Sequence, residues 1–446
     1  MNTPVFDFLQ KYNNDDFSRF HMPGHKGKGD LFEKFDITEI KGADSLFESD
    51  GILMESEKNA SSLFGTSRTL YSTQGSTLAI QTMLTLATSN IDNPVVLAVR
   101  NAHKAFINAC VLLDINVEWV FPEYIDGSIT SGIFTPEDIE NAIKDCERKP
   151  SAVYITTPDY LGRMAYLKPI SEICMKYNVA LLVDNAHGAY LNFLEDNIHP
   201  IYCGADMCCD SAHKTLPVLT GGGYLHISKS ADKSFSENAK TAMSFFASTS
   251  PSYLTLASLD LCNRYLDEKI KTDLKKIIPH IDILKKLDEK YNYINCSDEP
   301  LKASLYTINT GLYGYEIADI LRDNKIECEY ADETHIVFMF STFNTPEEIE
   351  NLTKALISIK QPHIRLEAPK FILAPPQKAM SIRKAGLSDS EEISVDKALG
   401  RICAKVVVAC PPGIPVVVSG EVINADTIKI LKRYSILTIN VVKLKQ

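Results

Sequence analysis

The sequence predicts an α/β fold built on a mainly parallel β-sheet. Between about residues 52 and 230, short continuous apolar runs alternate with helical patterns, as in parallel sheets that helices cover on both faces. Of the 446 residues, 45% are hydrophobic and 23% are charged, which agrees with a large buried core. At about 150 residues per domain, this length predicts two or three domains.

The individual elements follow from these runs. Thr135 before Pro136 is typical of a helix N-cap with proline in the first turn. Residues 301–310 and 335–341 are expected to form strands of a second, smaller layer. The elements expected in the first layer are strands at 95–99, 117–120, 152–156, 179–183, 206–209 and 223–228, and helices at 75–88, 135–145 and 168–177.

Four segments are expected along the chain. They are an N-terminal arm rich in turns (1–50), a major domain (51–260), a small α+β domain (261–365) and a C-terminal domain (366–446). The arm contains HMPGHKGKG at 21–29, whose proline and glycines exclude a regular helix or an inner strand.

Composition excludes several classes of partner. The net charge of −11 argues against nucleic acid and anionic membranes, and no signal peptide or transmembrane pattern is found. The 11 cysteines form no CxxC pair, which indicates reduced thiols in the cytoplasm. His21 and His25 have metal-ligand spacing only on a helix, which Pro23 and Gly24 prevent, so no metal site is expected.

The segment DSAHKT at 210–215 is the strongest local signal for chemistry. A lysine that forms a Schiff base must be held rigidly with its amine partly deprotonated. Lys214 follows a short predicted strand and lies beside His213, with the glycines 221–223 soon after. The alternative is that Lys214 is an ordinary solvated lysine.

A second signal is VALLVDNAHGAY at 179–190, in which a strand delivers Asp184 at its carboxyl end. Ligands of open α/β sheets bind at these ends, and a buried carboxylate there suits a protonated pyridine nitrogen. Asp184 could equally be a metal ligand or a helix cap.

Two further segments complete the pattern. Gly75-Ser76-Thr77 begins a predicted helix whose amides and hydroxyls suit a phosphate, and Ser211 offers another hydroxyl. Ser76 could instead be a plain N-cap. His103 follows a strand end and could stack on a pyridine ring, although a lone histidine is often structural.

Taken in order, these residues resemble the site of the fold-type I enzymes that use pyridoxal 5′-phosphate (PLP). The chain more narrowly resembles the short, wingless members of the Orn/Lys/Arg decarboxylase family. The matching motifs are HMPGHKGKG (21–29), DITEIKGADSLFE (36–48), SAHKTLPVLTGGGYLHI (211–227), TSPSYLTLASLD (249–260) and GRICAKVVVACPPGIPVVVSGE (400–421). The fold implied has a mainly parallel seven-stranded sheet in a transferase-like major domain.

The resemblance also implies a role for each matching residue. Lys214 would form the Schiff base with PLP, Asp184 would pair with the pyridinium nitrogen, and His103 would stack on the ring. His213 and His187 would act in catalysis beside the ring, and Glu421 would meet the distal cation of the substrate. The implied cofactor contacts are Gly75, Ser76, Thr77, His103, Asp184, Ala186, His187, Ser211, His213 and Lys214, with Thr249, Ser250 and Tyr253 reaching the site of a partner subunit.

The expected reaction is PLP-dependent decarboxylation of a basic amino acid (arginine, lysine or ornithine) in a cytoplasmic homodimer, yielding a precursor of polyamines. An aminotransferase or lyase remains an alternative, because Arg365, Arg383 and Arg401 could clamp a carboxylate. A degenerate PLP-binding regulatory protein is a third. The departures TGGG, CPPGIP and SGE from the usual family motifs leave the substrate open.

Overall fold

The structure is a computed structural model. The structure describes residues 1–446 except 16, 30, 125–127, 363, 365, 369–374, 410–412 and 445–446. The chain forms two compact units, each discontinuous in sequence. Unit 1 comprises Met1–Ser89, Ala180–Lys276 and Ser341–Phe343, and unit 2 comprises Asn90–Val179, Ile277–Phe340 and Asn344–Gln446.

A seven-stranded sheet is the central element, with strand order β1-β9-β8-β7-β6-β2-β3. The pairs β2–β3, β2–β6 and β7–β8 are parallel, whereas β9 runs antiparallel to both β8 and β1. This sheet confirms the predicted fold class. Its strands are β1 (Arg68–Ser72), β2 (Val95–Val99), β3 (Asn116–Val120), β6 (Ala152–Thr156), β7 (Ala180–Asp184), β8 (Met207–Asp210) and β9 (Gly223–Ile227).

Unit 1 contains the N-terminal helix α1 (Pro4–Asn14), in a segment that was expected to be rich in turns. The backbone amides of Val5 and Phe6 donate to Asp260, so a distant carboxylate caps this helix. The other helical segments of the unit are η1 (Glu33–Phe35), α2 (Ile52–Phe64), α3 (Gly75–Thr88), η2 (Ala189–Phe193), α7 (Ala212–Thr215), α8 (Lys233–Ser244) and α9 (Tyr253–Glu268), and α10 (Ile270–Lys285) runs from unit 1 into unit 2.

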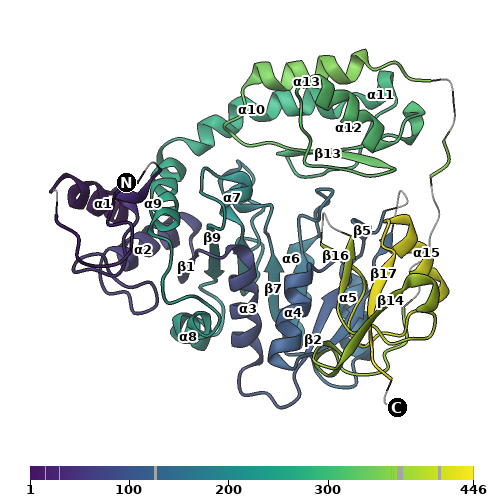
Figure 1. Ribbon diagram of the computed structural model, residues 1–446, viewed down its shortest axis with the longest axis horizontal. Helices are drawn as coiled ribbons and strands as arrows, with labels where there is room; N and C mark the ends of the chain where they lie inside the picture. Colours follow the sequence, from purple (N-terminus) through teal and green to yellow (C-terminus); the bar gives the residue numbers. More distant parts are fainter. Residues whose placement is uncertain are drawn as a thin grey trace. The chain divides into compact units, whose positions relative to one another are not determined.

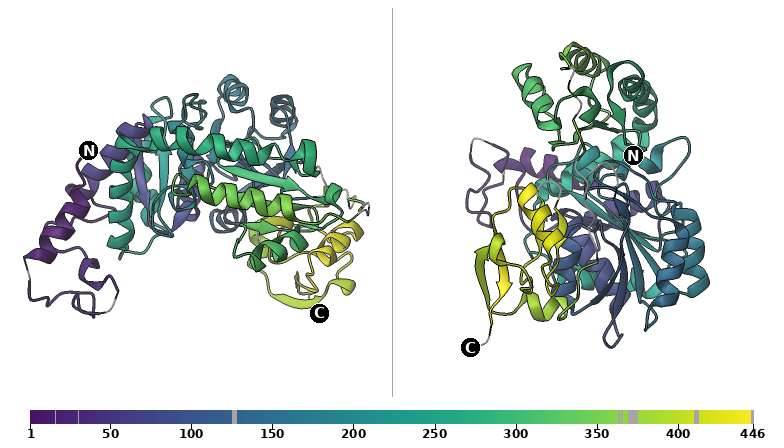
Figure 2. Two further views of the ribbon diagram at one scale, coloured as in Figure 1. Left: turned by 90° about the horizontal axis from the view of Figure 1, so that it is seen from above. Right: turned by 90° about the vertical axis from the view of Figure 1, so that its right-hand side faces the viewer.

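Unit 2 contains its own antiparallel sheet of four strands, in the order β10-β11-β13-β12. Figure 1 shows α12 and α13 on one side of β13, and Figure 2 shows the same helices from above and from the side. The elements of this layer are α11 (Asp288–Tyr291), β10 (Ile294–Asn295), β11 (Lys302–Tyr306), η3 (Ile308–Thr310), α12 (Gly314–Asp323), β12 (Tyr330–Ala331), β13 (His335–Met339) and α13 (Pro346–Ser358).

The C-terminal part of unit 2 contains two antiparallel strand pairs, β14–β17 and β15–β16, and its core includes Val416, Ile430 and Val441. Its elements are α14 (Ile382–Gly386), β14 (Ser390–Ser394), η4 (Val395–Lys397), β15 (Val407–Ala409), β16 (Ile414–Val417), α15 (Ala425–Arg433) and β17 (Thr438–Val442). The remaining elements of the unit are α4 (Lys104–Leu113), β4 (Glu123–Tyr124), β5 (Gly132–Ile133), α5 (Pro136–Asp145) and α6 (Leu167–Tyr177).

Element boundaries agree closely with the sequence patterns where a local signal exists. The N-cap predicted at Thr135 is present and is part of a capping box, in which the Thr135 hydroxyl accepts from the amide of Asp138. The strand predicted over residues 301–310 was wrong in part, because the observed strand ends at Tyr306 and a 3-10 turn follows. Within the described residues, no helix combines the length and apolar character that a membrane crossing requires.

Candidate active site

Lys214 lies in α7, the short helix that begins directly after β8. Its side chain is exposed, yet Nζ donates to His187 Nε2 at 2.9 Å. An amine held by an imidazole differs from a freely solvated lysine, so this geometry favours the reactive role over the ordinary one.

Asp184 ends β7 and is only 2% exposed. One oxygen, Oδ1, accepts from the amide of Ala186 at 3.2 Å and from the thiol of Cys209 at 3.6 Å. These contacts hold a buried carboxylate at the carboxyl end of a parallel strand, where the fold binds ligands.

The turn at Gly75 lies against the glycines that follow Lys214. The amide of Gly75 donates to Gly221 O at 2.6 Å, and a Cβ added at Gly223 would lie 3.2 Å from the carbonyl carbon of Gly75. The first residue of α3 is Gly75 with φ of +63°, and its N-cap Gln74 makes no side-chain cap. Ser76 is therefore inside the first turn rather than the N-cap, and the helix N-terminus suits an anion.

His213 lies beside this turn, because a Cβ at Gly75 would contact its ring at 3.7 Å. Its Nδ1 donates to Gly222 O at 2.9 Å, which leaves Nε2 with the lone pair when the ring is neutral. Burial lowers the pKa of His213, although the hydrogen bond to Gly222 opposes the shift in part. A neutral imidazole of this kind can accept a proton. Ser211 is buried at the start of α7 and makes no side-chain cap there.

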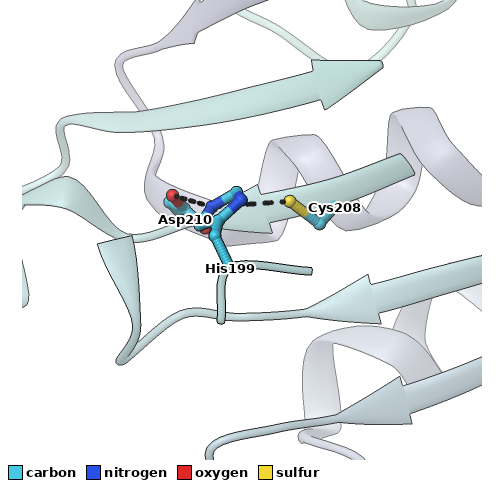
Figure 3. A group of neighbouring side chains, drawn as sticks. All are labelled: His199, Cys208 and Asp210. Atoms are coloured by element: carbon cyan, nitrogen blue, oxygen red, sulfur yellow. Dashed lines mark hydrogen bonds and ion pairs between the residues drawn. The ribbon is translucent and has the colours of Figure 1, made fainter. Parts of the chain in front are cut away.

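A second group of polar side chains, which is fully buried, was not anticipated from the sequence. His199, Cys208 and Asp210 lie together in unit 1 (Figure 3). His199 Nε2 and His226 Nε2 each lie 3.1 Å from Asp210 Oδ2. A usable signal existed, because Cys208 and Asp210 share one face of β8 and His226 is the cross-strand partner of Cys208.

In unit 2, His103 is the N-cap of α4 and its Nδ1 accepts from the amide of Ala105 at 3.2 Å. A Cβ added at Gly413 would lie 2.8 Å from His103 Nε2, so the glycine of the CPPGIP motif packs against this imidazole. The stacking role expected of His103 stays a prediction.

Glu421 is 5% exposed and already has a cationic partner. Its Oε2 accepts from Arg100 Nη2 at 2.9 Å and from the amide of Val418 at 2.7 Å. Arg100 is fully buried and stacks on Trp119, at 4.8 Å from the guanidinium carbon to the ring centre. The expected contact between Glu421 and a substrate cation stays a prediction, and it would have to compete with Arg100.

The motif TSPSY divides into exposed and buried residues. Thr249 and Ser250 are exposed, whereas Tyr253 is fully buried and its hydroxyl donates to Asp44 O at 2.6 Å. Tyr253 thus supports its own chain, and the expectation that Thr249, Ser250 and Tyr253 reach the site of a partner subunit stays a prediction.

Two of the three arginines that an aminotransferase could use have partners within the chain. Arg383 donates to Val111 O and Leu112 O, and Arg401 pairs with Glu391 at 2.7 Å. Arg365 lies outside the described residues. These pairings weaken the alternative in which Arg383 or Arg401 clamps a substrate carboxylate.

Comparison with protein families identifies the chain. The model described as "Orn/Lys/Arg decarboxylase, major domain" matches residues 3–301, and the corresponding C-terminal domain matches residues 364–438. The chain belongs to the Orn/Lys/Arg decarboxylase family. The family implies PLP as the cofactor and an amino-acid decarboxylase as the class of enzyme.

Relatives and solved structures agree with this membership. Proteins named arginine decarboxylase from Halalkalibacterium halodurans and Bacillus subtilis are each 29% identical, over 96% of this chain and 93% and 92% of theirs. The Francisella novicida lysine decarboxylase LdcF has the same fold, with a TM-score of 0.82, 18% identity and coverage of 99% and 81%. Serine palmitoyltransferase from Sphingomonas wittichii shares the fold more distantly, with a TM-score of 0.56, 14% identity and coverage of 80% and 83%.

The residues of unit 1 fit the chemistry of PLP. They combine an amine beside an imidazole (Lys214 and His187), a buried carboxylate at a strand end (Asp184) and an uncapped helix N-terminus for a phosphate (Gly75).

Proposed function

We propose that this protein decarboxylates a basic amino acid with PLP carried on Lys214, and that arginine is the preferred substrate. The main support for this proposal is the 2.9 Å contact between Lys214 Nζ and His187 Nε2, in the same unit as Asp184 and the Gly75 turn. The relatives named arginine decarboxylase, which align over nearly the whole chain, support arginine.

When bound, PLP supplies an electron sink for the bond to the substrate carboxylate. In this proposal the amine of Lys214 attaches the cofactor, and Asp184 keeps a proton on the ring nitrogen. The N-terminus of α3 and the hydroxyls of Ser76, Thr77 and Ser211 bind the phosphate.

Two imidazoles border the lysine in different ways. His187 holds the amine of Lys214 through Nε2, with Ala186 before it in the turn after Asp184. His213 keeps a lone pair on Nε2 because Nδ1 donates to Gly222 O. We propose that His213 or Lys214 returns a proton to the substrate Cα once carbon dioxide has left.

We further propose a cytoplasmic homodimer whose amine product is a precursor of polyamines. Large apolar side chains of the N-terminal arm are exposed, among them Phe20 (95%) and Leu31 (80%), and such side chains favour burial against a second subunit. Exposed Thr249 and Ser250 could then reach the partner's site. The described cysteines form no disulfide, as suits a reducing compartment.

The experiment is a turnover assay of the PLP-loaded protein with arginine, lysine and ornithine, measuring carbon dioxide and the amine. Arginine should give the largest kcat/KM. Lys214→Ala should abolish turnover and the absorbance band of the lysine-bound cofactor, while the exposed control Lys229→Ala should keep both. Keto-acid formation without carbon dioxide would instead favour an aminotransferase, and a bound cofactor without turnover a regulatory protein.

A further inference from the structure

Asp210 ends β8 and is fully buried, four residues before Lys214. Its Oδ2 accepts from both His199 Nε2 and His226 Nε2 at 3.1 Å. Its Oδ1 accepts from Asn185 Nδ2 at 2.7 Å. One carboxylate therefore joins β8 to β9, to the loop before β8, and to the turn that follows β7.

The turn after β7 carries the residues that border the lysine. Asn185 follows Asp184 directly, and a Cβ added at Gly188 would collide with Asn185 Oδ1, so the amide side chain lies under the backbone of Gly188. The amide of Gly188 also donates to Asn185 O at 2.8 Å. His187 lies between these two residues in sequence, so the position of Asn185 determines where the imidazole of His187 can lie.

We infer that Asp210 is a positioning residue that, through Asn185, holds the turn carrying Asp184 and His187 in register with Lys214. This inference rests on the proposed role of Lys214 and extends it to a side chain that touches neither the lysine nor any ligand. The path is continuous, from Asp210 to Asn185, from Asn185 to Gly188, and from His187 to Lys214 at 2.9 Å.

The negative charge of Asp210 strengthens its hydrogen bonds to Asn185, His199 and His226. Burial by itself would raise the pKa of Asp210, but the two neighbouring imidazoles outweigh burial and the net pKa lies below its usual value. Asp210 is therefore ionised at neutral pH and acts as an acceptor for three side-chain donors. Hydrogen bonds to an ionised acceptor are about twice as strong as neutral ones.

A metal ion is the alternative occupant of this cluster, because one atom each from His199, Cys208 and Asp210 lie within 4.8 Å of one another (Figure 3). The hydrogen bonds argue against it. The amide of Ile201 donates to His199 Nδ1 at 3.4 Å, so the ring proton of a neutral His199 lies on Nε2 and points at Asp210 rather than leaving a lone pair for a metal. Burial also raises the pKa of Cys208, which disfavours the thiolate that a metal needs.

The test compares Asp210→Asn with Asp206→Asn in the full-length protein. Asp206 is a matched control, since it lies just before the amino end of β8 and accepts from the amide of Leu181 at 2.8 Å. Asn185→Ala is the second variant, because it removes the link and leaves the buried charge in place. It keeps the inference testable if Asp210→Asn does not fold.

Two measurements do not depend on turnover. The first is the rate at which Lys214 of the cofactor-free protein is reductively methylated by formaldehyde and cyanoborohydride, followed by peptide mass spectrometry with Lys229 as internal reference. The second is the affinity for added PLP. Asp210→Asn and Asn185→Ala should each change the methylation rate of Lys214 and the affinity for PLP by about tenfold, as for one lost hydrogen bond to a charged group. The double variant should change these two quantities little more than either single variant does. Asp206→Asn should leave both unchanged.

Loss of thermal stability in Asp210→Asn without a change at Lys214 or in PLP affinity would overturn the inference, and so would a stoichiometric metal ion in the wild-type protein. If the wild-type protein binds PLP on Lys214 but releases no carbon dioxide, the proposed function fails while the positioning role of Asp210 still stands or falls by these two measurements.

Discussion

Around Lys214 in unit 1, backbone turns and strand ends place polar groups beside one another while the lysine stays exposed. Around Arg100 in unit 2, the guanidinium and Glu421 are both buried and form an ion pair through Arg100 Nη2. The first arrangement is typical of a site that receives a ligand, and the second of a pair that supports a fold. Charged residues of a family motif therefore differ in what they are free to do, and motif membership alone does not reveal the difference.

The largest effect is expected on the unit 1 side of this comparison, from Asp184→Ala. If Asp184 stabilises a protonated ring nitrogen as proposed, loss of its carboxylate should lower turnover by about 10²–10³-fold, as for other groups that stabilise transition-state charge. PLP should stay bound, because Lys214 and the Gly75 turn are untouched. Turnover and the absorbance of the cofactor would be measured together.

Asp206→Asn serves as the control for this variant and should keep most of the activity, since Asp206 lies near the opposite end of the same strands. Full activity in Asp184→Ala would show that the electron-sink role has been assigned to the wrong carboxylate.

The next effect concerns the pair in unit 2. Glu421→Gln leaves Arg100 buried without its anion, which should lower the free energy of unfolding by about 3–5 kcal/mol, whereas Arg100→Met with Glu421→Leu should recover much of it. Denaturant unfolding measures both. If Glu421 instead meets the substrate cation, Glu421→Gln should raise KM strongly and cost little stability, so the two roles separate in one variant.

The parts of the molecule that sequence predicts well are those set by neighbours along the chain. The strands that end at Val99, Asp184 and Asp210 and the cap at Thr135 follow from local runs of apolar residues and from turn chemistry. The order of Gly75, Asp184 and Lys214 could be recognised for the same reason, because consecutive strands of a parallel sheet end on one edge.

The parts that sequence missed depend on partners far away in the chain. Glu421 pairs with Arg100 across 321 positions, and the cap of α1 comes from Asp260, 254 positions from Phe6. His226 reaches Asp210 across 16 positions on the neighbouring strand. No residue pattern near Glu421 or Asp260 specifies its partner, so these two pairings become visible only in the folded chain.

The smallest expected effect is on the pH dependence of the free energy of unfolding. This dependence should differ between buried carboxylates that contact imidazoles and those that do not. Asp260 in unit 1 and Asp159 in unit 2 have pKa values raised from 3.8 to about 6, chiefly by burial. A raised carboxylate pKa means that the native state binds the proton more tightly than the unfolded state, so stability is gained as pH falls from about 6 toward 4 and is lost as pH rises.

Each of these groups should therefore contribute up to about 3 kcal/mol of pH-dependent stability. Unfolding of the wild-type protein and of Asp159→Asn or Asp260→Asn, measured at pH 7 and pH 4, should show the difference between wild type and variant moving in favour of the wild type at pH 4. Asp210 should not behave in this way, because its imidazole partners lower its pKa. A difference that stays constant with pH would mean that Asp159 and Asp260 ionise without a loss of stability. The hydrogen bond from Ser131 to Asp159 and those from the α1 amides to Asp260 would then offset burial fully, as the imidazoles do for Asp210.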